Sequence, residues 1–332
     1  MDIMVVGETI GQDGLPFSGT HHWLLKKSMS EIGIRIDDCH LTAVFKEPLD
    51  LFSVCGPKPA GIPGMPTLIK NKYMPAQYAH HLYSFYKEVN RVNPNLIIAA
   101  GSTAAWALCG SAGIKAIRGA SMAAVQSALT PVGCGYDRQF QVLPTYHPST
   151  ILKDWSLRPV FLSDLDKARR YSTNPLVRRP ERIIWIEPTL ADLQIFEDNF
   201  ILHSDRLSID IETANEQITC IGFAVGPSVA IVIPFFSRAR KNYWRTQADE
   251  MAAWSYVRRW CQMKPSVFQN GMYDMNWLWR RYGIPCIGAA HDTMLLHHAL
   301  QPEMQKGLGF LGSLYTDEAS WKFMRKSAKT EE

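Results

Sequence analysis

The sequence contains neither a CxxC pair nor a long apolar run. Its seven cysteines are scattered, and an odd, unpatterned set excludes a disulfide framework or a zinc site built on paired cysteines and indicates a reducing cytoplasm. No apolar run reaches the roughly 20 residues that span a membrane. The opening MDIMVVGE is expected to be a strand, not a signal peptide. We therefore expect a cytoplasmic protein without a membrane partner, and the sequence shows no internal repeat or low-complexity tract.

The chain also has no large excess of positive over negative charge. The net charge of +4 over 332 residues is weak support for a polyanionic partner. The stretch KARRYSTNPLVRRPER, residues 167–182, is more distinctive because it carries six basic residues and one acidic residue. It fits a solvated linker with Pro175 and Pro180, and it equally fits a basic segment that follows a phosphate backbone. Both interpretations stay open.

The first half alternates strands and helices. Apolar strands are expected at MDIMVVGE, DCHLTAVF, NLIIAAG and FQVLPTYHPS, with helices between them and a closing helix at LSDLDKARRY. This alternation predicts an α/β fold with a parallel sheet between two helical layers. The stretch from Cys55 to Met74 is rich in Pro and Gly and is expected to be a loop.

The second half has a different order. A strand at RIIWIEP and a helix capped by Thr189 precede three consecutive strands, LSIDIET, TCIGFAVG and VAIVIPF, which are typical of an antiparallel meander. Helices and the short strand SVFQN follow. We expect a boundary near residue 176, with one domain over 1–175 and a second, mixed-sheet domain over 176–332.

Acidic residues interrupt the apolar strand LSIDIET. Asp210 and Glu212 lie two residues apart and therefore share one face of the strand. Asn270 and Asp274 lie four apart at the start of a helix and also share a face. Like charges this close repel unless a cation lies between them. Asp210, Glu212 and Asp274 are thus candidate ligands for two Mg²⁺ or Mn²⁺ ions about 4 Å apart.

DIET, NxxxD and HDTMLLHHAL, in this order, resemble the DnaQ-like 3′–5′ exonucleases, which have an RNase H-like fold. The similarity covers roughly residues 181–332 and is greatest to the proofreading domain of family A DNA polymerases. The resemblance implies that Asp210, Glu212 and Asp274 are catalytic metal ligands and that Asn270 supports the site and contacts DNA.

The family supplies a fourth carboxylate from a later YxxxD motif. The late candidate here, YTDEA, has Ala319 at the fifth position. Three explanations stay open: the chain is truncated, a separate polypeptide completes the site, or Asp292 substitutes, although the resemblance makes a structural role for Asp292 the better interpretation. An incomplete site predicts weak nuclease activity for the chain alone.

VGETIGQDGLPFSG, IIAAGSTAAWALCG, IRG and VLPTYHPSTIL, in this order, resemble the uracil-DNA glycosylase superfamily, in particular family 4 and its phage relatives, over about residues 1–170. The resemblance implies that His147 donates a hydrogen bond to the leaving uracil anion and that Phe17 stacks on the flipped base. It places Glu8 where the family positions water. It also implies that Ser149 and Arg118 contact the DNA backbone.

Two departures weaken the expectation of glycosylase activity. Ala43 stands at the substrate-binding position where the family reads uracil with an Asn, and Ala cannot pair with the base edge, which costs about 1–3 kcal/mol. The segment before Pro16 and Phe17 is also shorter than in the family. The cysteines that hold the family 4 iron–sulfur cluster are missing near Lys46 and around His80 and His81, so no cluster is expected.

Three functions follow from these resemblances. The first is a phage-type replication protein, a proofreading exonuclease module with a glycosylase-like DNA-binding domain, resembling the N-terminal part of phage family A DNA polymerases and working with, or cut from, such a polymerase. Its substrate would be single-stranded 3′ ends of DNA, including uracil-containing DNA, in a bacterial host cytoplasm. The second is a standalone repair enzyme that excises uracil and trims ends. The third is a non-catalytic DNA-binding or polymerase-docking platform.

Overall fold

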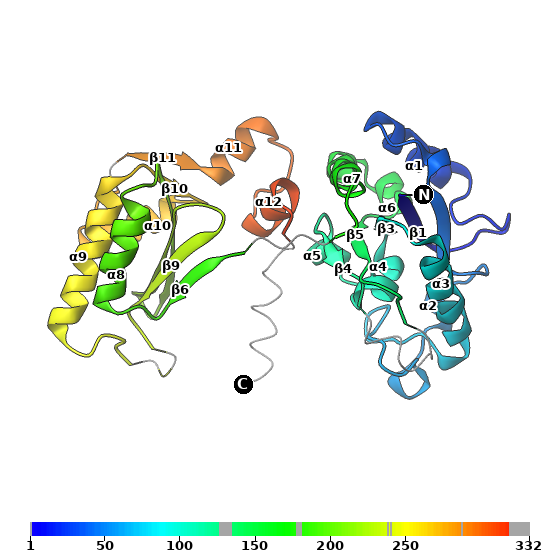
Figure 1. Cartoon of the computed structure of the whole chain (residues 1–332), viewed down its shortest axis with the longest axis horizontal. Helices are drawn as coiled ribbons and strands as arrows, with labels where there is room; N and C mark the ends of the chain where they lie inside the picture. The colour runs from blue at the N-terminus through cyan, green and yellow to red at the C-terminus, as the bar shows by residue number, and fades with distance from the viewer. Residues whose placement is uncertain are drawn as a thin grey trace. The chain divides into compact units, whose positions relative to one another are not determined.

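The computed structural model describes residues 2–125, 135–176, 181–237, 239, 241–286 and 288–318. The chain forms two compact units, one of Met1–Arg178 with Gly309–Glu332 and one of Arg179–Leu308 (Figure 1). The sequence assigned everything after residue 176 to the second domain. The structure corrects this assignment, because the chain from Gly309 belongs to the first unit.

The sheet of the first unit has the strand order β2-β1-β3-β5-β4. Its four longer strands pair in parallel, and the short β4 is antiparallel to β5. The strands are β1 (Ile3–Thr9), β2 (His40–Phe45), β3 (Leu96–Ala100), β4 (Met122–Ala123) and β5 (Gln141–Thr145). In β3 and β5 every residue is buried, as expected for strands covered on both faces.

Helices cover both faces of this sheet and form the predicted three-layer arrangement. Helix α4 packs on β1 and β3 and α3 on β2, while α7 packs on β3, β5 and α1. The helices are α1 (Gly19–Glu31), α2 (Leu51–Val54), α3 (Ala79–Val92), α4 (Ser102–Cys109), α5 (Ile114–Ile117), α6 (Pro148–Lys153), α7 (Arg158–Tyr171) and α12 (Leu308–Tyr315). Residues 167–171, the start of the basic stretch for which a linker was one interpretation, are therefore the end of α7, and Lys167 itself is buried.

The second unit contains a mixed six-stranded sheet with the order β11-β10-β7-β8-β9-β6. The predicted antiparallel meander is confirmed as β7-β8-β9, and β10, β11 and β6 add in parallel to their neighbours. The strands are β6 (Ile183–Ile186), β7 (Leu207–Ala214), β8 (Gln217–Ala224), β9 (Val229–Pro234), β10 (Ser266–Phe268) and β11 (Ala289–Asp292). This is the mixed-sheet, RNase H-like class expected from the sequence.

The side chains of Thr189, Thr246 and Asp292 cap the N-termini of three helices of the second unit. Thr189 makes a capping box with Asp192, which confirms the predicted cap of α8. The helices are α8 (Leu190–Phe196), α9 (Gln247–Met263), α10 (Met272–Tyr282) and α11 (Thr293–Leu300). Within the described residues, no helix is long and apolar enough to span a bilayer.

Candidate active sites

The imidazole of His147 follows the carboxyl end of β5 and caps α6. Its Nδ1 accepts a hydrogen bond from the Ser149 backbone N–H at 3.2 Å and lies 2.8 Å from Ser149 Oγ. Because Nδ1 accepts from an N–H, the neutral ring carries its proton on Nε2. Burial, with smaller contributions from His21 and Lys153, lowers the pKa of His147 to about 4. The ring is therefore neutral near pH 7 and offers Nε2–H as a donor.

Two other residues expected at this site, Phe17 and Ala43, lie in the loop that follows β1 and in β2. Phe17, only 2% exposed, stacks on His147 with 5.6 Å between ring centroids. It also packs against Gly7, where an added Cβ would lie 3.0 Å from Phe17 Cζ. Ala43 is fully buried and pairs with Gly7 across β2 and β1. Phe17 thus stacks on His147 itself, and Ala43 supplies no polar group.

Glu8 is exposed near the carboxyl end of β1, at the same edge of the parallel sheet as His147. Its Oε2 accepts a hydrogen bond from Thr103 Oγ1 at 2.8 Å, at the start of α4. The carboxyl edge of a parallel sheet is where α/β proteins usually bind ligands. Glu8 and His147 therefore lie at the edge where a substrate is expected.

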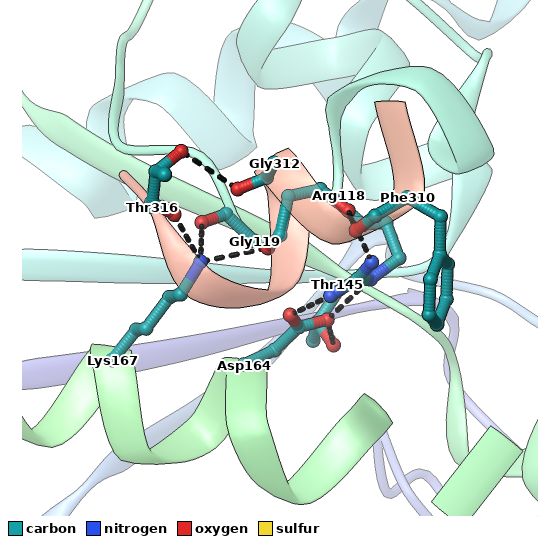
Figure 2. Close-up of polar contacts among 9 residues, drawn as sticks. Arg118, Gly119, Thr145, Asp164, Lys167, Phe310, Gly312 and Thr316 are labelled. Atoms are coloured by element: carbon teal, nitrogen blue, oxygen red, sulfur yellow. Dashed lines mark hydrogen bonds and ion pairs between the residues drawn. The ribbon is translucent and has the colours of Figure 1, made fainter. Parts of the chain in front are cut away.

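The expected DNA contact of Arg118 is corrected by the structure. Arg118 is 1% exposed. Its Nε donates to Asp164 Oδ2 at 2.9 Å, its Nη2 donates to Asp164 Oδ1 and its Nη1 donates to Ser313 Oγ at 2.8 Å (Figure 2). These donors are unavailable to a phosphate. Ser149, half-buried, contacts His147 Nδ1, and its expected contact with the DNA backbone stays a prediction.

Mild acid is expected to destabilise the first unit through His147. The pKa of His147 in the folded chain is about 4, below the value near 6.5 of an unfolded histidine. The unfolded state therefore binds more protons between these values, and stability present above pH 6.5 is lost as the pH falls toward 4. We expect His147→Asn to reduce the loss of unfolding free energy between pH 7 and pH 4.5 by about 1–3 kcal/mol. Urea unfolding at the two pH values measures it, with His22→Asn, a change at a half-buried position on α1, as the control.

The carboxylates of the second unit are positioned by strand alternation. In β7, Leu207, Ile209 and Ile211 are buried, whereas Asp210 and Glu212 are exposed on the opposite face. Asp274, in the first turn of α10 and 5% exposed, accepts a hydrogen bond from the Ile211 N–H at 3.0 Å. This bond places the Asp274 carboxylate against the backbone between the two strand carboxylates.

The Asp274 carboxyl lies in an environment that disfavours its charged form. Burial and, to a smaller extent, the charges of Asp210 and Asp292 together raise the pKa of Asp274 to about 6, against the lowering effect of the Ile211 hydrogen bond. A divalent cation would relieve this repulsion, and carboxylate oxygens are ligands that Mg²⁺ and Mn²⁺ prefer. The donors therefore fit such an ion in kind. Among the described residues, however, no three His, Cys, Asp or Glu side chains are already grouped for metal binding, so the expected three-carboxylate cluster is not preassembled.

Asp292 and Asn270 have local structural roles. Asp292 accepts hydrogen bonds from the backbone N–H groups of Asn270, Gly271, Met294 and Leu295. Desolvation would raise the pKa of Asp292, but these four donors lower it overall. Asn270 is exposed with φ 62° in the turn that precedes α10. Asp292 thus joins this turn to α11, which fits the structural interpretation better than a fourth metal ligand.

Sequence reasoning missed several partners of these residues. It did not identify the Ile211 N–H that holds Asp274, nor Asp164 and Lys167, which are buried on α7. The apolar face of LSDLDKARRY offered one signal, because Asp164 and Lys167 share that face with Val160 and Ala168 at helical spacing. A main-chain partner such as Ile211 has no sequence signature.

The family model of the uracil DNA glycosylase superfamily matches residues 1–170. A type-4 uracil-DNA glycosylase from Thermotoga maritima is 26% identical over 175 residues, which cover 51% of this chain and 77% of the relative. The first unit is a three-layer α/β domain with a neutral histidine at the carboxyl edge of its sheet. The chain belongs to the uracil DNA glycosylase superfamily.

Solved exonucleases show a distant similarity. Brucella melitensis NrnC with bound Mg²⁺ is 15% identical, with a TM-score of 0.29 over 42% of this chain and 62% of that one. Escherichia coli RNase D, an exoribonuclease, is 14% identical, with a TM-score of 0.31 over 44% and 36%. The Aedes aegypti Nibbler EXO domain is 10% identical, with a TM-score of 0.32 over 43% and 72%. This chain spans less than two thirds of NrnC and of RNase D.

Proposed function

We propose that this protein is a 3′–5′ DNA exonuclease that depends on Mg²⁺ or Mn²⁺, with its glycosylase-superfamily unit serving as a DNA-binding domain. The observation that carries the proposal is the Asp274 carboxylate, held by the Ile211 N–H at 3.0 Å; burial, with a smaller contribution from the charge of Asp210, raises its pKa to about 6. Strained carboxylate pairs of this kind mark functional sites. Asp210 and Glu212, on the exposed face of β7, are accessible to a DNA end.

Each residue has a stated task in this proposal. Asp210, Glu212 and Asp274 would hold the cations, which would supply Lewis-acid activation of water and stabilisation of the leaving 3′ oxygen. The Ile211 N–H keeps the Asp274 carboxylate aimed at the face that carries Asp210 and Glu212. Asn270, exposed at the start of α10, would contact the DNA. Asp210 and Glu212 would shift by side-chain rotation to complete the set.

The fourth carboxylate belongs to the same proposal. Because four backbone N–H groups already bind the Asp292 carboxylate, we infer that the missing acid comes from a polymerase of family A, in a phage-type replication complex. The third hypothesis, a non-catalytic platform, has less support, because it gives no reason for acidic side chains at consecutive outward positions of β7.

The nuclease is expected to need a divalent ion and to be slow. Single-stranded DNA labelled at its 5′ end should shorten stepwise from the 3′ end with Mg²⁺ or Mn²⁺ and should stay intact in EDTA. Gel electrophoresis of the products measures this directly. A 3′-phosphorothioate strand is the control, because it should resist shortening. Rapid proofreading by the chain alone would contradict the dependence on an external carboxylate, and a metal-independent reaction would contradict the proposal.

Uracil excision is the second candidate function, and the His147 tautomer favours it. Nε2–H is free of the Ser149 contacts and could donate to the oxygen of a leaving uracil anion. Burial keeps the ring neutral, so this donor does not depend on a protonation step. Ala43 and the Phe17 ring stacked on His147 oppose efficient binding of a flipped base.

We therefore expect slow uracil release. Uracil-containing single-stranded DNA, incubated with the protein and then treated with alkali, should break only at uracil and only weakly. His147→Asn should lower the rate by about 10²-fold or more, as for loss of a donor to a developing charge. Thymine-containing DNA of the same sequence is the control. A rate equal in wild type and variant would rule out His147 as the donor.

A further inference from the structure

Helix α12 belongs to the first unit, although the chain reaches it only after passing through the second unit. It packs beside α7 and the segment that follows α5, where Figure 2 shows polar side chains of the first unit directed at its last turn. Gly309, Leu311, Gly312 and Ser313 of this helix are buried. The first unit is therefore completed by residues from the far end of the chain.

Two buried cations hold α12 in place. Lys167 Nζ donates to the carbonyl oxygens of Ser313 at 2.7 Å, Thr316 at 2.5 Å and Gly119 at 3.0 Å. Arg118 Nη1 donates to Ser313 Oγ at 2.8 Å. Cations at a helix C-terminus satisfy carbonyl groups that lack partners within the helix. The contact is specific, because it uses both the helix end and the Ser313 hydroxyl.

Gly119 makes this close approach possible. Its φ is 72°, and a Cβ at this position would lie 2.8 Å from Ser313 O and 2.7 Å from Asp164 Oδ1. Only glycine fits here without displacing α12 or Asp164. In the IRG motif, the cation Arg118 and the glycine Gly119 are therefore adjacent, and both contact α12.

The residues that contact α12 also contact Pro144, Thr145 and Tyr146, which precede His147. Gly119 N–H donates to Pro144 O at 2.9 Å, and Thr145 Oγ1 donates to Asp164 Oδ2 at 2.8 Å. The Arg118 guanidinium lies 5.9 Å from the centre of the Tyr146 ring. An unbroken series of contacts thus runs from Ser313 through Arg118 and Asp164 to the backbone that carries His147.

Gly101, which packs against His147, is hydrogen-bonded to the end of the same strand. Thr145 O accepts the Gly101 N–H at 2.8 Å. Gly101 has φ 98°, and a Cβ on it would lie 3.0 Å from His147 Cβ. Gly101 therefore packs closely against the histidine. Any movement of Thr145 changes the position of both His147 and Gly101.

We propose that α12 is a positioning element for His147, acting from Ser313 through Arg118, Asp164 and Thr145. The effect of α12 on catalysis rests on the second candidate function, uracil excision. Ser313 is a positioning residue, since it touches neither the base nor His147. The base-excision site would then be fully ordered only in a chain that continues past residue 308.

Single hydroxyl changes in the full chain test this proposal. Ser313→Ala removes the acceptor of Arg118, and Ser313→Thr restores a hydroxyl. Ser172→Ala is the matched control, because Ser172 Oγ donates to Arg169 O at 3.0 Å just as Ser313 Oγ donates to Phe310 O at 2.8 Å. Amide hydrogen exchange by NMR reports the Gly101, Gly119 and Ser149 N–H groups, and uracil release gives kcat and KM.

We expect Ser313→Ala to speed exchange at these three amides by about 10-fold or more while the amides of β1 keep their rates. We expect kcat for uracil release to fall about 10-fold with KM within about 2-fold, and Ser313→Thr to recover most of both. Unchanged exchange at Gly101 and Ser149, or equal acceleration throughout the first unit, would overturn the proposal. If the wild type releases no uracil, the proposed activity fails, and the exchange data still decide the role of α12.

Discussion

Asp210→Ala is expected to reduce 3′-end degradation by at least about 1,000-fold, which corresponds to about 4 kcal/mol of lost transition-state stabilisation. Asp210 is the strand carboxylate whose charge raises the pKa of Asp274. Without it, one negative charge is lost from a site that has to hold divalent ions, and metal ions contribute several kcal/mol to such reactions. Initial rates on 5′-labelled single-stranded DNA with saturating Mn²⁺ measure the loss.

Two further variants make this result interpretable. Asp274→Asn keeps an oxygen that can accept the Ile211 N–H, and it should lose activity to a similar degree without unfolding the site. Glu216→Ala removes an exposed acid on the same hairpin, paired with Arg281 at 3.1 Å, and should retain wild-type activity. If Asp210→Ala cleaves DNA as fast as Glu216→Ala, the carboxylate face of β7 is not the catalytic site.

Local pattern was sufficient to predict the strands that position these sites. The alternation in LSIDIET gave the exposed face of Asp210 and Glu212 correctly, because a half-buried strand leaves every second residue on one side. The alternation of strands and helices in the first half predicted the parallel sheet, in which β3 and β5 are buried along their whole length. These signals depend only on neighbours in sequence.

The contacts that complete the sites are long-range, and the sequence did not reveal them. The hydrogen bond between Arg118 and Ser313 joins residues 195 positions apart in the sequence, and that between Ile211 and Asp274 joins residues 63 positions apart. For Arg118, the resemblance supplied a role in DNA binding, whereas packing of α12 turned the side chain inward. For Asp292, a carboxylate near other acids looked like an alternative metal ligand, whereas four backbone N–H groups bind it instead. Whether three carboxylates converge depends on side-chain positions that spacing cannot specify.

Arg118→Ala is expected to destabilise the first unit by about 3–5 kcal/mol, because it leaves the Asp164 carboxylate buried without its ion-pair partner. Asp164 is fully buried, and of its hydrogen bonds with the described part of the chain only that from Thr145 Oγ1 would remain. Such a loss is a large part of the roughly 5–15 kcal/mol that holds a domain together. Hydrogen exchange of the β1 and β3 amides measures the stability of this unit separately from the other.

The size of the effect distinguishes a buried pair from a surface pair. Arg281→Ala breaks the exposed pair with Glu216 and should cost less than about 1 kcal/mol. The double change Arg118→Met with Asp164→Leu removes both charges and should recover much of the stability lost in Arg118→Ala, because the penalty arises from one unpaired charge. A cost of Arg118→Ala no greater than that of Arg281→Ala would mean that Asp164 is protonated or hydrated in the folded chain. Arg118 would then not be the residue that joins α12 to the sheet.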